Sequence, residues 1–406
     1  MWLKRFDRIS IDIAFCIWLK LRMQSAPKLT LVESFTGLPD PRVTGRCDHD
    51  LLDVLVIALC CLLCGGSTFN DMEDFGHAKE AWFRTFLRLR NGIPGHDTFN
   101  RLFAALKPEA FLDCFLRWTQ SLREAVAGEI VALDGKALRR AGKKGQSVRY
   151  VVNAWASANG LVLGQLKVDE KSNEITALPP LLRALELAGC IVTIDAMGCQ
   201  KKIAQEIIEA DADYVLALKG NQETVHAEVK EFLDDAVVQQ QAAAARPRGP
   251  KPTPSLAFLE TVDKDHGRLE IRRHWQSEDL KWFADRGAWE GLRSVGLVES
   301  VRQEGNQKPT VERRYYLSSL RVDIDKFARA VREHWGVENK VHWVLDVQFG
   351  EDQSRARAGH AAENLATLRR LALNLLRRDK TKKRGIRGKR LNAAWNHSYL
   401  LRLLAF

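Results

Sequence analysis

The chain has 406 residues, which is too many for one minimal domain and enough to bury a large hydrophobic core. Hydrophobic residues make up 46% and charged residues 28%, as in an ordinary soluble globular protein, and the eight cysteines lack the paired spacing of a disulfide framework, which fits a reducing cytoplasm. The net charge of +11 indicates a polyanionic partner, for which nucleic acid is the natural candidate.

Residues 1–25 are interpreted as an N-terminal extension. Their basic start and the apolar stretch at 11–19 resemble a signal peptide, but Asp12 interrupts that stretch and no small-residue cleavage site is clear. Met23 is an alternative start of the chain. The apolar run at 51–64 is too short to cross a bilayer, so no membrane association is expected.

Residues 26–126 are predicted to form a small all-helical N-terminal domain. After a loop rich in proline and glycine at 26–46, helices are expected at 51–64, 69–77, 79–89, 98–106 and 108–125. Asp50 and Asp97 are candidate N-caps. Short helices joined by tight turns suit a helix-turn-helix-like module, whose recognition helix would present Arg101 to DNA. The alternative is a bundle that only packs against the main domain.

The middle of the chain alternates strands and helices. Strands are expected at 130–133, 149–155, 161–168, 190–194 and 214–218, and helices at 174–188 and 201–210. Asn159-Gly160 predicts a hairpin turn between the second and third strands. This succession predicts an α/β domain with a ribonuclease-H-like core over 127–376, in which the first three strands are antiparallel and the later ones parallel to the first.

A β-rich insertion is expected inside this core domain. Residues 231–255 have low complexity and are interpreted as a frayed helix that leads into a proline-rich linker. Strands are then predicted within about 256–320, at 266–272, 292–301 and 313–317.

An amphipathic helix is predicted over 325–346. Its apolar face contains two ionisable groups and consists of Phe327, Val331, Trp335, Glu338, His342 and Leu345. A carboxylate on a buried face costs free energy unless a positively charged partner neutralises it. Gly336 has no side chain and leaves space near Glu338. Together these features suggest that a cation binds at this face. With a slightly different register, Glu338 would instead be a solvated surface acid.

The C-terminal part combines a second amphipathic helix at about 361–376 with a basic tail at 377–406. Between residues 369 and 390 there are eleven Lys and Arg residues against one acid. This charge predicts contact with a DNA backbone, and the alternative is a solvated tail that only aids solubility. The candidate contacts are Lys382, Lys383 and Arg384.

Two upstream acids, Asp134 and Asp195, follow apolar strands at their carboxyl ends, where α/β sheets place their ligands. Taken singly, Asp134 could mark a turn and Asp195 could cap a helix. Together with Glu338 they make three carboxylates, which repel each other unless divalent cations lie between them. Oxygen ligands favour Mg²⁺ or Mn²⁺, and two such ions about 3.5–4 Å apart would support attack on a phosphodiester.

A basic stretch follows Asp134 closely and is expected to contact a phosphate backbone beside the metal ions. Its members are Lys136, Arg139, Arg140, Lys143, Lys144 and Arg149. The alternative interpretation of this stretch is a solvated loop.

Four segments carry a more specific pattern: VALDGK at 131–136, TIDAMGCQ at 193–200, YVLALKGNQ at 214–222 and HWGVENKVHWVLDVQFGED at 334–352. In combination they resemble the DDE transposases of bacterial insertion sequences, and among these the ISAs-type, or H-repeat-associated, family. The resemblance extends over residues 38–376.

That resemblance implies a catalytic triad of Asp134, Asp195 and Glu338, a ribonuclease-H-like fold and two Mg²⁺ or Mn²⁺ ions. It implies cutting and joining of double-stranded DNA at terminal inverted repeats by a bacterial protein that acts in the cytoplasm on the nucleoid. A homo-oligomer is expected because two DNA ends must be held together.

The sequence departs from relatives that have a Tyr-Arg-Glu-Lys signature around the glutamate. His334 lies four residues before Glu338, and Leu345 lies seven residues after it. His334 is therefore a candidate replacement for the arginine as a phosphate or hairpin contact, and Asn339 is a further candidate DNA contact. Whether excision passes through a DNA hairpin stays open at this point.

Several alternatives remain. His334, Glu338 and His342 are spaced by four residues, so one helix face could bind zinc, although there is no HExxH pattern. A catalytically silent or repurposed DNA-binding relative, and a metal-dependent nuclease without strand transfer, are alternative functions. Three other acids could be the third carboxylate, although a solvated acidic turn also explains them: Asp346, Glu351 and Asp352.

Overall fold

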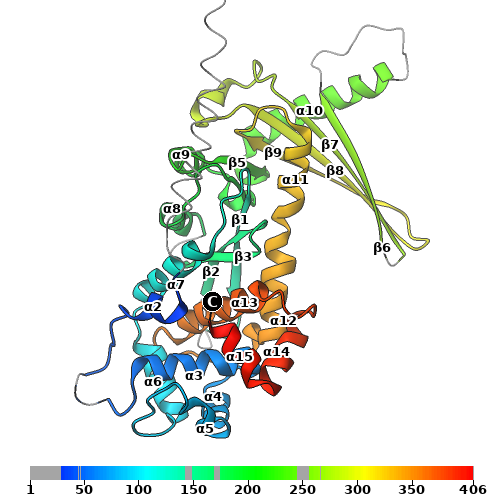
Figure 1. The fold of residues 1–406 in the computed structure, drawn as a ribbon. Helices are drawn as coiled ribbons and strands as arrows, with labels where there is room; N and C mark the ends of the chain where they lie inside the picture. Colours follow the sequence, from blue (N-terminus) through cyan, green and yellow to red (C-terminus); the bar gives the residue numbers. More distant parts are fainter. Residues whose placement is uncertain are drawn as a thin grey trace, which may run out of the picture.

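The computed structural model describes residues 29–43, 45, 47–141, 149–168, 174–244, 256–265 and 267–405. The expected N-terminal extension at 1–25 and the basic residues Lys143 and Lys144 lie outside these ranges. The described part is a mixed α/β protein with one large mixed sheet, helices on both faces of that sheet and a helical region in the N-terminal part (Figure 1).

The sheet has nine strands in the order β3-β2-β1-β4-β5-β9-β8-β7-β6. The strands are β1 Ile130–Leu138, β2 Arg149–Ala156, β3 Leu161–Val168, β4 Ile191–Ile194, β5 Asp213–Leu218, β6 Ala257–Asp265, β7 Arg268–Ser277, β8 Ser294–Glu304 and β9 Thr310–Ser318. β1 to β3 form an antiparallel meander, and β4 and β5 run parallel to β1. The pairing predicted for these five strands is therefore confirmed.

β1 is longer than the sequence predicts. The apolar run ends at Leu133, but the strand continues to Leu138 because its second half pairs with β2, from Asp134 opposite Asn153 to Leu138 opposite Arg149. The parallel ladder to β4 ends earlier, at Leu133 opposite Ile194. The prediction that Asp134 lies at the end of its strand is therefore wrong, although it does lie where the parallel ladder ends.

The strands of the predicted insertion continue the central sheet. β9 pairs antiparallel with β5, and β8, β7 and β6 follow as antiparallel neighbours. In Figure 1 these strands project from the body of the molecule as a long arm. The helix before them, α10 Glu223–Ala244, has 22 residues and is regular over 231–244, the part of the expected frayed segment at 231–255 that belongs to the helix; residues 245–255 lie outside the described ranges.

Helices cover the two faces of the sheet in different groups. α8 Glu174–Ala184, α9 Lys201–Glu209 and α10 pack on one face, over Val192 and Leu216 among others. α11 Ile324–His334 packs on the other face, where it meets Ile191 and Val215. Successive residues of a strand point to opposite faces, so adjacent positions of β4 and β5 serve both layers.

The N-terminal helices are α2 Leu31–Phe35, α3 Leu51–Cys64, α4 Phe69–Ala78, α5 Glu80–Phe83, α6 His96–Ala105 and α7 Pro108–Leu122. α3 has the predicted bounds and ends at Gly65, whose φ of 117° is accessible to glycine. Neither predicted cap is formed: the Asp50 side chain makes no capping hydrogen bond, and α6 begins at His96, so that Asp97 lies inside the helix. The helix expected at 79–89 is reduced to α5.

The C-terminal segment is largely folded. After α13 Ala361–Arg378 come α14 Ile386–Trp395 and α15 His397–Leu404. Lys389 and Arg390 are buried, and Arg390 donates hydrogen bonds to the carbonyl of Leu62 in α3. Part of the charge of the basic tail predicted at 377–406 is therefore not available at the surface, because Lys389 and Arg390 cap backbone carbonyls inside the protein.

Among the described residues, no single helix is long and apolar enough to cross a membrane. α3 and α4 reach that length only together, and the pair is bent by 95°.

The contact between α11 and β8 leaves no room for a side chain at Gly296. A Cβ atom there would lie 2.3 Å from Cζ of Phe327, which is fully buried. Gly296→Ala should therefore displace α11 and lower the free energy of unfolding by about 1–3 kcal/mol, measured by urea denaturation. Gly287→Ala is the control, since no atom lies within 4 Å of the place that its methyl group would take. Equal stability of the two variants would contradict this packing.

Candidate active site

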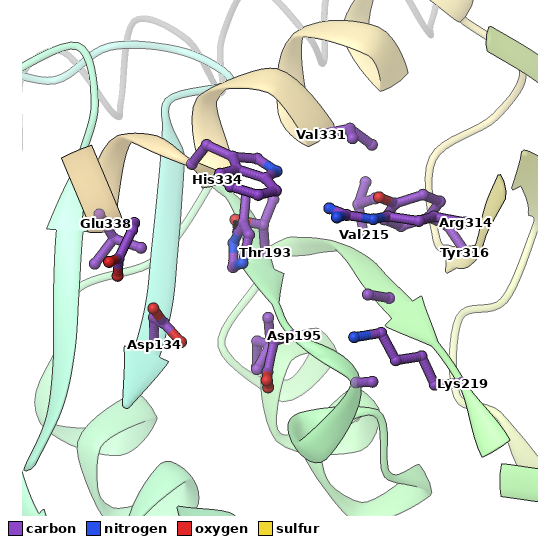
Figure 2. A pocket seen from close by; sticks show the side chains of 15 residues that line it. Asp134, Thr193, Asp195, Val215, Lys219, Arg314, Tyr316, Val331, His334 and Glu338 are labelled. Carbon is purple, nitrogen blue, oxygen red and sulfur yellow. Dashed lines mark hydrogen bonds between the residues drawn. The ribbon is translucent and has the colours of Figure 1, made fainter. Parts of the chain in front are cut away.

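The three predicted acids line one cleft. It has a volume of about 260 Å³ and is formed by the ends of β4 and β5, the inner part of β9, and the end of α11 with the turn that follows. In Figure 2, Asp134, Asp195 and Glu338 face this cleft, with Asp134 seen between the other two. In the parallel pairing of β1 with β4, Leu133 lies opposite Ile194. Asp134 follows Leu133 and Asp195 follows Ile194, which explains why the two acids lie close together.

Glu338 comes from a π-helical turn and not from a continuous α-helix. α11 ends at His334, the π-helix η4 spans Val337–His342, and α12 spans Trp343–Phe349. The prediction of one helix over 325–346 is therefore correct for its extent but wrong for its geometry. Short π-helical segments are found inside α-helices and are frequent at functional sites.

Asp134, Glu338 and His342 form a compact group. One ligand atom from each lies within 4.8 Å of the others. Nδ1 of His342 is 2.9 Å from Oε2 of Glu338 and 3.5 Å from Oδ2 of Asp134. The hydrogen bond from His342 lowers the pKa of Glu338, so this carboxylate is held in the charged form.

A chain of buried polar groups fixes which nitrogen of His342 carries the hydrogen. Nε of Arg370 can only donate a hydrogen bond, and it lies 2.5 Å from Oδ1 of Asn153. The NH₂ group of Asn153 therefore faces His342. Nδ2 of Asn153 lies 3.0 Å from Nε2 of His342, so Nε2 accepts a hydrogen bond from this NH₂ group. Nδ1 of His342 therefore carries the hydrogen and donates it toward Glu338.

The chain of polar groups ends in a fully buried ion pair. Nη1 of Arg370 is 2.8 Å from Oε1 of Glu351, and neither side chain is exposed to solvent. Burial opposes ionisation of Glu351, but the charges of Arg370 and Arg369 outweigh that effect and lower its pKa. Glu351, an alternative third carboxylate from the sequence, therefore supports the site from behind and does not line the cleft.

The other alternative acids bind a basic residue that the sequence assigns to DNA. Nζ of Lys136 is buried and lies 2.6 Å from Asp346, and it is 3.7 Å from Asp352. Burial raises the pKa of Asp346, and Lys136 opposes that rise. Lys136 is thus paired inside the protein and is not available at the surface for contact with DNA. Arg139 and Arg140, in contrast, are exposed.

The remaining candidate DNA contacts lie at different places. His334 lines the cleft, and its Nδ1 is 2.9 Å from Oγ1 of Thr193. Asn339 is exposed on η4, and Arg101 is exposed on α6. Lys382, Lys383 and Arg384 belong to the loop between α13 and α14, with Lys383 and Arg384 exposed.

Sequence reasoning missed two cations that line the cleft. Figure 2 shows both: Lys219 is the residue after β5, and Arg314 comes from β9. The guanidinium of Arg314 lies 5.0 Å from the ring centre of Trp335. No local pattern singles out Arg314, because strand pairing alone brings β9 beside β5. Lys219 lies within one of the four motifs, but the motif alone gives it no role.

The donor set fits a divalent cation. Asp134 and Glu338 supply carboxylate oxygen atoms that lie within 4.8 Å of each other and of a ring nitrogen of His342. Asp195 faces the same cleft, while its Oδ1 accepts a hydrogen bond of 3.1 Å from the amide of Met197, so it also caps the short η1 Ala196–Gly198. Hard cations with oxygen ligands are the class this set favours.

Comparison with known proteins gives matches over most of the chain. Residues 127–375 match the family model described as "Transposase DDE domain", and residues 32–119 match the model described as "DDE_Tnp_1-associated". The chain is 39% identical over 381 residues to "Putative transposase YncI" of Escherichia coli O157:H7, covering 93% of this chain and 94% of that protein.

Two further relatives have similar identities. "H repeat-associated putative transposase YhhI" of Escherichia coli K12 is 36% identical over 381 residues, covering 92% of this chain and 97% of that protein. "Uncharacterized protein in dhlA 3'region" of Xanthobacter autotrophicus is 41% identical over 295 residues, covering 71% of this chain and 94% of that protein.

Burial of His334 makes stability depend on pH. Burial lowers its pKa from 6.5 to about 4, so the folded protein binds a proton less readily than the unfolded chain. This contribution to stability is present above pH 6.5 and is lost as the pH falls toward 4. We expect His334→Gln to remove it, so that in EDTA the variant loses up to about 2 kcal/mol less stability than wild type between pH 7 and pH 5. Parallel pH profiles would contradict this burial effect.

Proposed function

The chain belongs to the DDE transposase family, and we propose on that basis that it cleaves and joins DNA at the terminal inverted repeats of an insertion sequence. The family membership confirms the resemblance seen in the sequence motifs. The observation that carries the proposal is the convergence of Asp134, Asp195 and Glu338 in one cleft, from two neighbouring strands and a π-helical turn.

We further propose that residues 127–376 are a ribonuclease-H-like catalytic core. The strand order β3-β2-β1-β4-β5, antiparallel in the first three strands and parallel in β1, β4 and β5, supports this assignment. The segment at 256–320 would be an insertion between β5 and α11. Residues 26–126 would be an associated helical domain.

The proposed cofactors are two Mg²⁺ or Mn²⁺ ions, held jointly by Asp134 and Asp195, with Glu338 completing one of the two sites. Such ions, when bound, activate an oxygen nucleophile and neutralise charge that develops at the phosphorus. Within the protein, His342 holds Glu338 in place through its Nδ1 hydrogen, and Asn153 and Arg370 hold His342. Lys219 and Arg314 add positive charge to the wall of the cleft, where a phosphate would enter.

The proposed reaction has two steps at the same cleft. Water first attacks a phosphodiester at the end of the element, and the bond to the leaving 3′-oxygen breaks as the new bond to phosphorus forms. The freed 3′-hydroxyl then attacks a phosphodiester of target DNA, which joins the two strands and releases a 3′-hydroxyl of the target. Since two ends must be held together, the active form is proposed to be a homo-oligomer on double-stranded DNA.

Removing the third carboxylate should separate binding from chemistry. Glu338 is exposed on η4, so Glu338→Ala leaves no cavity in the core and should fold normally and bind inverted-repeat DNA. Its cleavage and joining of labelled inverted repeats in Mg²⁺ should fall by at least about 10³-fold, because the site loses one of its three carboxylates. The measurement is product formation on a denaturing gel.

Asp325→Ala is the control for this experiment, since Asp325 is an exposed acid in the first turn of α11. It should retain wild-type cleavage. If Glu338→Ala still cleaved the DNA, Glu338 would not be one of the catalytic carboxylates. Cleavage without joined products in the wild type would indicate a nuclease without strand transfer, and binding without cleavage would indicate a catalytically silent relative.

Three basic residues in the loop after α13 are proposed to bind the DNA backbone. Each phosphate contact that is lost reduces the slope of log Kd against log salt concentration by about 0.9. A variant with Lys382→Gln, Lys383→Gln and Arg384→Gln should therefore show a slope lower by about 1–3, measured by fluorescence anisotropy.

The matched control neutralises three exposed lysines outside this loop: Lys201 and Lys202 at the start of α9, and Lys281. Its slope should equal that of the wild type. A slope unchanged in the first variant, or lowered equally in both, would count against a role for this loop.

A further inference from the structure

A second hollow adjoins the catalytic cleft. It has a volume of about 330 Å³ and lies between β7, β8 and β9 on one side and α11 with η4 on the other. It shares four lining residues with the cleft, namely Arg314, Tyr316, Val331 and Trp335. We call this hollow the arm groove, because most of it is formed by the strands of the projecting arm in Figure 1.

The arm groove and the cleft belong to the same face of the sheet. Arg314 on β9 lies opposite Val298 on β8, which lies opposite His274 on β7, and all three line the groove. Gly296 on β8 lies under Phe327 of α11, so this is the face that α11 covers. A chain molecule that leaves the cleft along this face would therefore enter the groove directly.

The groove carries an organised surplus of positive charge. Its lining includes two acids against five arginines, which are Arg268, Arg272, Arg302, Arg314 and Arg332. One carboxylate, that of Glu270, holds three of these guanidinium groups at 3.2, 2.7 and 3.1 Å, from Arg268, Arg272 and Arg302 respectively. Two further acids take part among the described residues: Asp263 of β6 pairs with Arg272 and lies 3.9 Å from Arg332, and Glu312 pairs with Arg314. Three acids therefore face the five arginines, which leaves a surplus of two positive charges.

One donor in this cluster is left over. Nε of Arg268 is buried and has no hydrogen-bond partner among the residues that the structure describes. This N–H group can therefore donate to an acceptor that enters the groove. Phosphate oxygens are the acceptors that suit several guanidinium groups in fixed orientation, because each group can donate two parallel hydrogen bonds.

The opposite face of the same strands has no such surplus. There Glu299 binds Arg273 and Arg313 at 3.0 and 2.8 Å. Glu260 and Asp234 supply two more acids to the same two arginines. Lys230 also pairs with Asp234, so three acids face three basic residues in this cluster and no surplus of positive charge remains there.

We propose that the arm groove binds the sugar-phosphate backbone of a DNA strand that continues out of the catalytic cleft, with Arg268, Arg272 and Arg302 as the phosphate-binding group. The proposal deepens the proposed function and rests on it. The groove would fix the path of the strand on one side of the scissile phosphate, and would thereby position that phosphate at Asp134, Asp195 and Glu338.

The test compares two double variants that are matched by construction. Arg268→Ala with Arg302→Ala removes two of the three guanidinium groups at Glu270. Arg273→Ala with Arg313→Ala removes both at Glu299 on the opposite face. Both are measured in EDTA by fluorescence anisotropy, on inverted-repeat duplexes with and without flanking DNA, at salt concentrations from about 50 to 300 mM.

The groove variant should lose about 10–30-fold in affinity at about 0.15 M salt and show a slope lower by about 2, while the opposite-face variant keeps wild-type values. The loss should disappear on the duplex that lacks the flanking strand. Arg268→Lys with Arg302→Lys, which keeps the charge, should retain the slope and shows that any loss is not a folding defect. Equal losses in both alanine variants, no loss in the groove variant, or an equal loss on the duplex without flanking DNA would overturn the proposal.

The two proposals fail in distinguishable ways. If the wild-type protein binds the duplex in EDTA but neither cleaves nor joins it in Mg²⁺, the proposed function is contradicted. The difference in affinity between the two double variants still shows whether the arm groove binds DNA. Wild-type protein that binds no DNA overturns both.

Discussion

Repulsion between the carboxylates that converge in one cleft is the constraint on which the structure around that cleft depends. Asp134 and Glu338 place oxygen atoms within 4.8 Å of each other and of a ring nitrogen of His342. They are held there by elements that cannot relax easily, namely the ladder between β1 and its neighbours and the π-helical turn η4. Carboxylates this close together repel each other, and a cation between them relieves that repulsion, so the arrangement favours a bound cation.

The support for this arrangement comes from the core behind it. The Arg370–Glu351 pair is fully buried, and loss of one partner from such a pair typically costs about 3–5 kcal/mol, because the other charge is left uncompensated. Arg370 sets the orientation of Asn153, Asn153 sets the tautomer of His342, and His342 orients Glu338. The geometry of the cleft is thus tied to the stability of the domain, and the same sheet face continues into the arm groove.

Much of this arrangement could be predicted from the sequence, because it depends on local patterns. Strand alternation and the Asn159-Gly160 turn predict β2 and β3, and the three acids singled out in the sequence line one cleft. The buried position expected for Glu338 is wrong, because its side chain is exposed on η4. What could not be predicted depends on partners distant in sequence. β2 extends β1 past Asp134, Asp346 and Asp352 pair with Lys136, and α3 receives the buried Arg390. The π-helical turn likewise has no signature in the period of its apolar residues, which is why the sequence predicts a regular helix around Glu338.

The most direct test of the central claim is anomalous diffraction from crystals of the protein soaked in Mn²⁺. We predict two manganese peaks in the cleft, both within ligand distance of Asp134 and Asp195 and one of them also bound by Glu338, and the loss of both peaks in Asp195→Ala. A single peak ligated by His342 without Asp195, or manganese bound only outside the cleft, would contradict the assignment of these three carboxylates as the metal site.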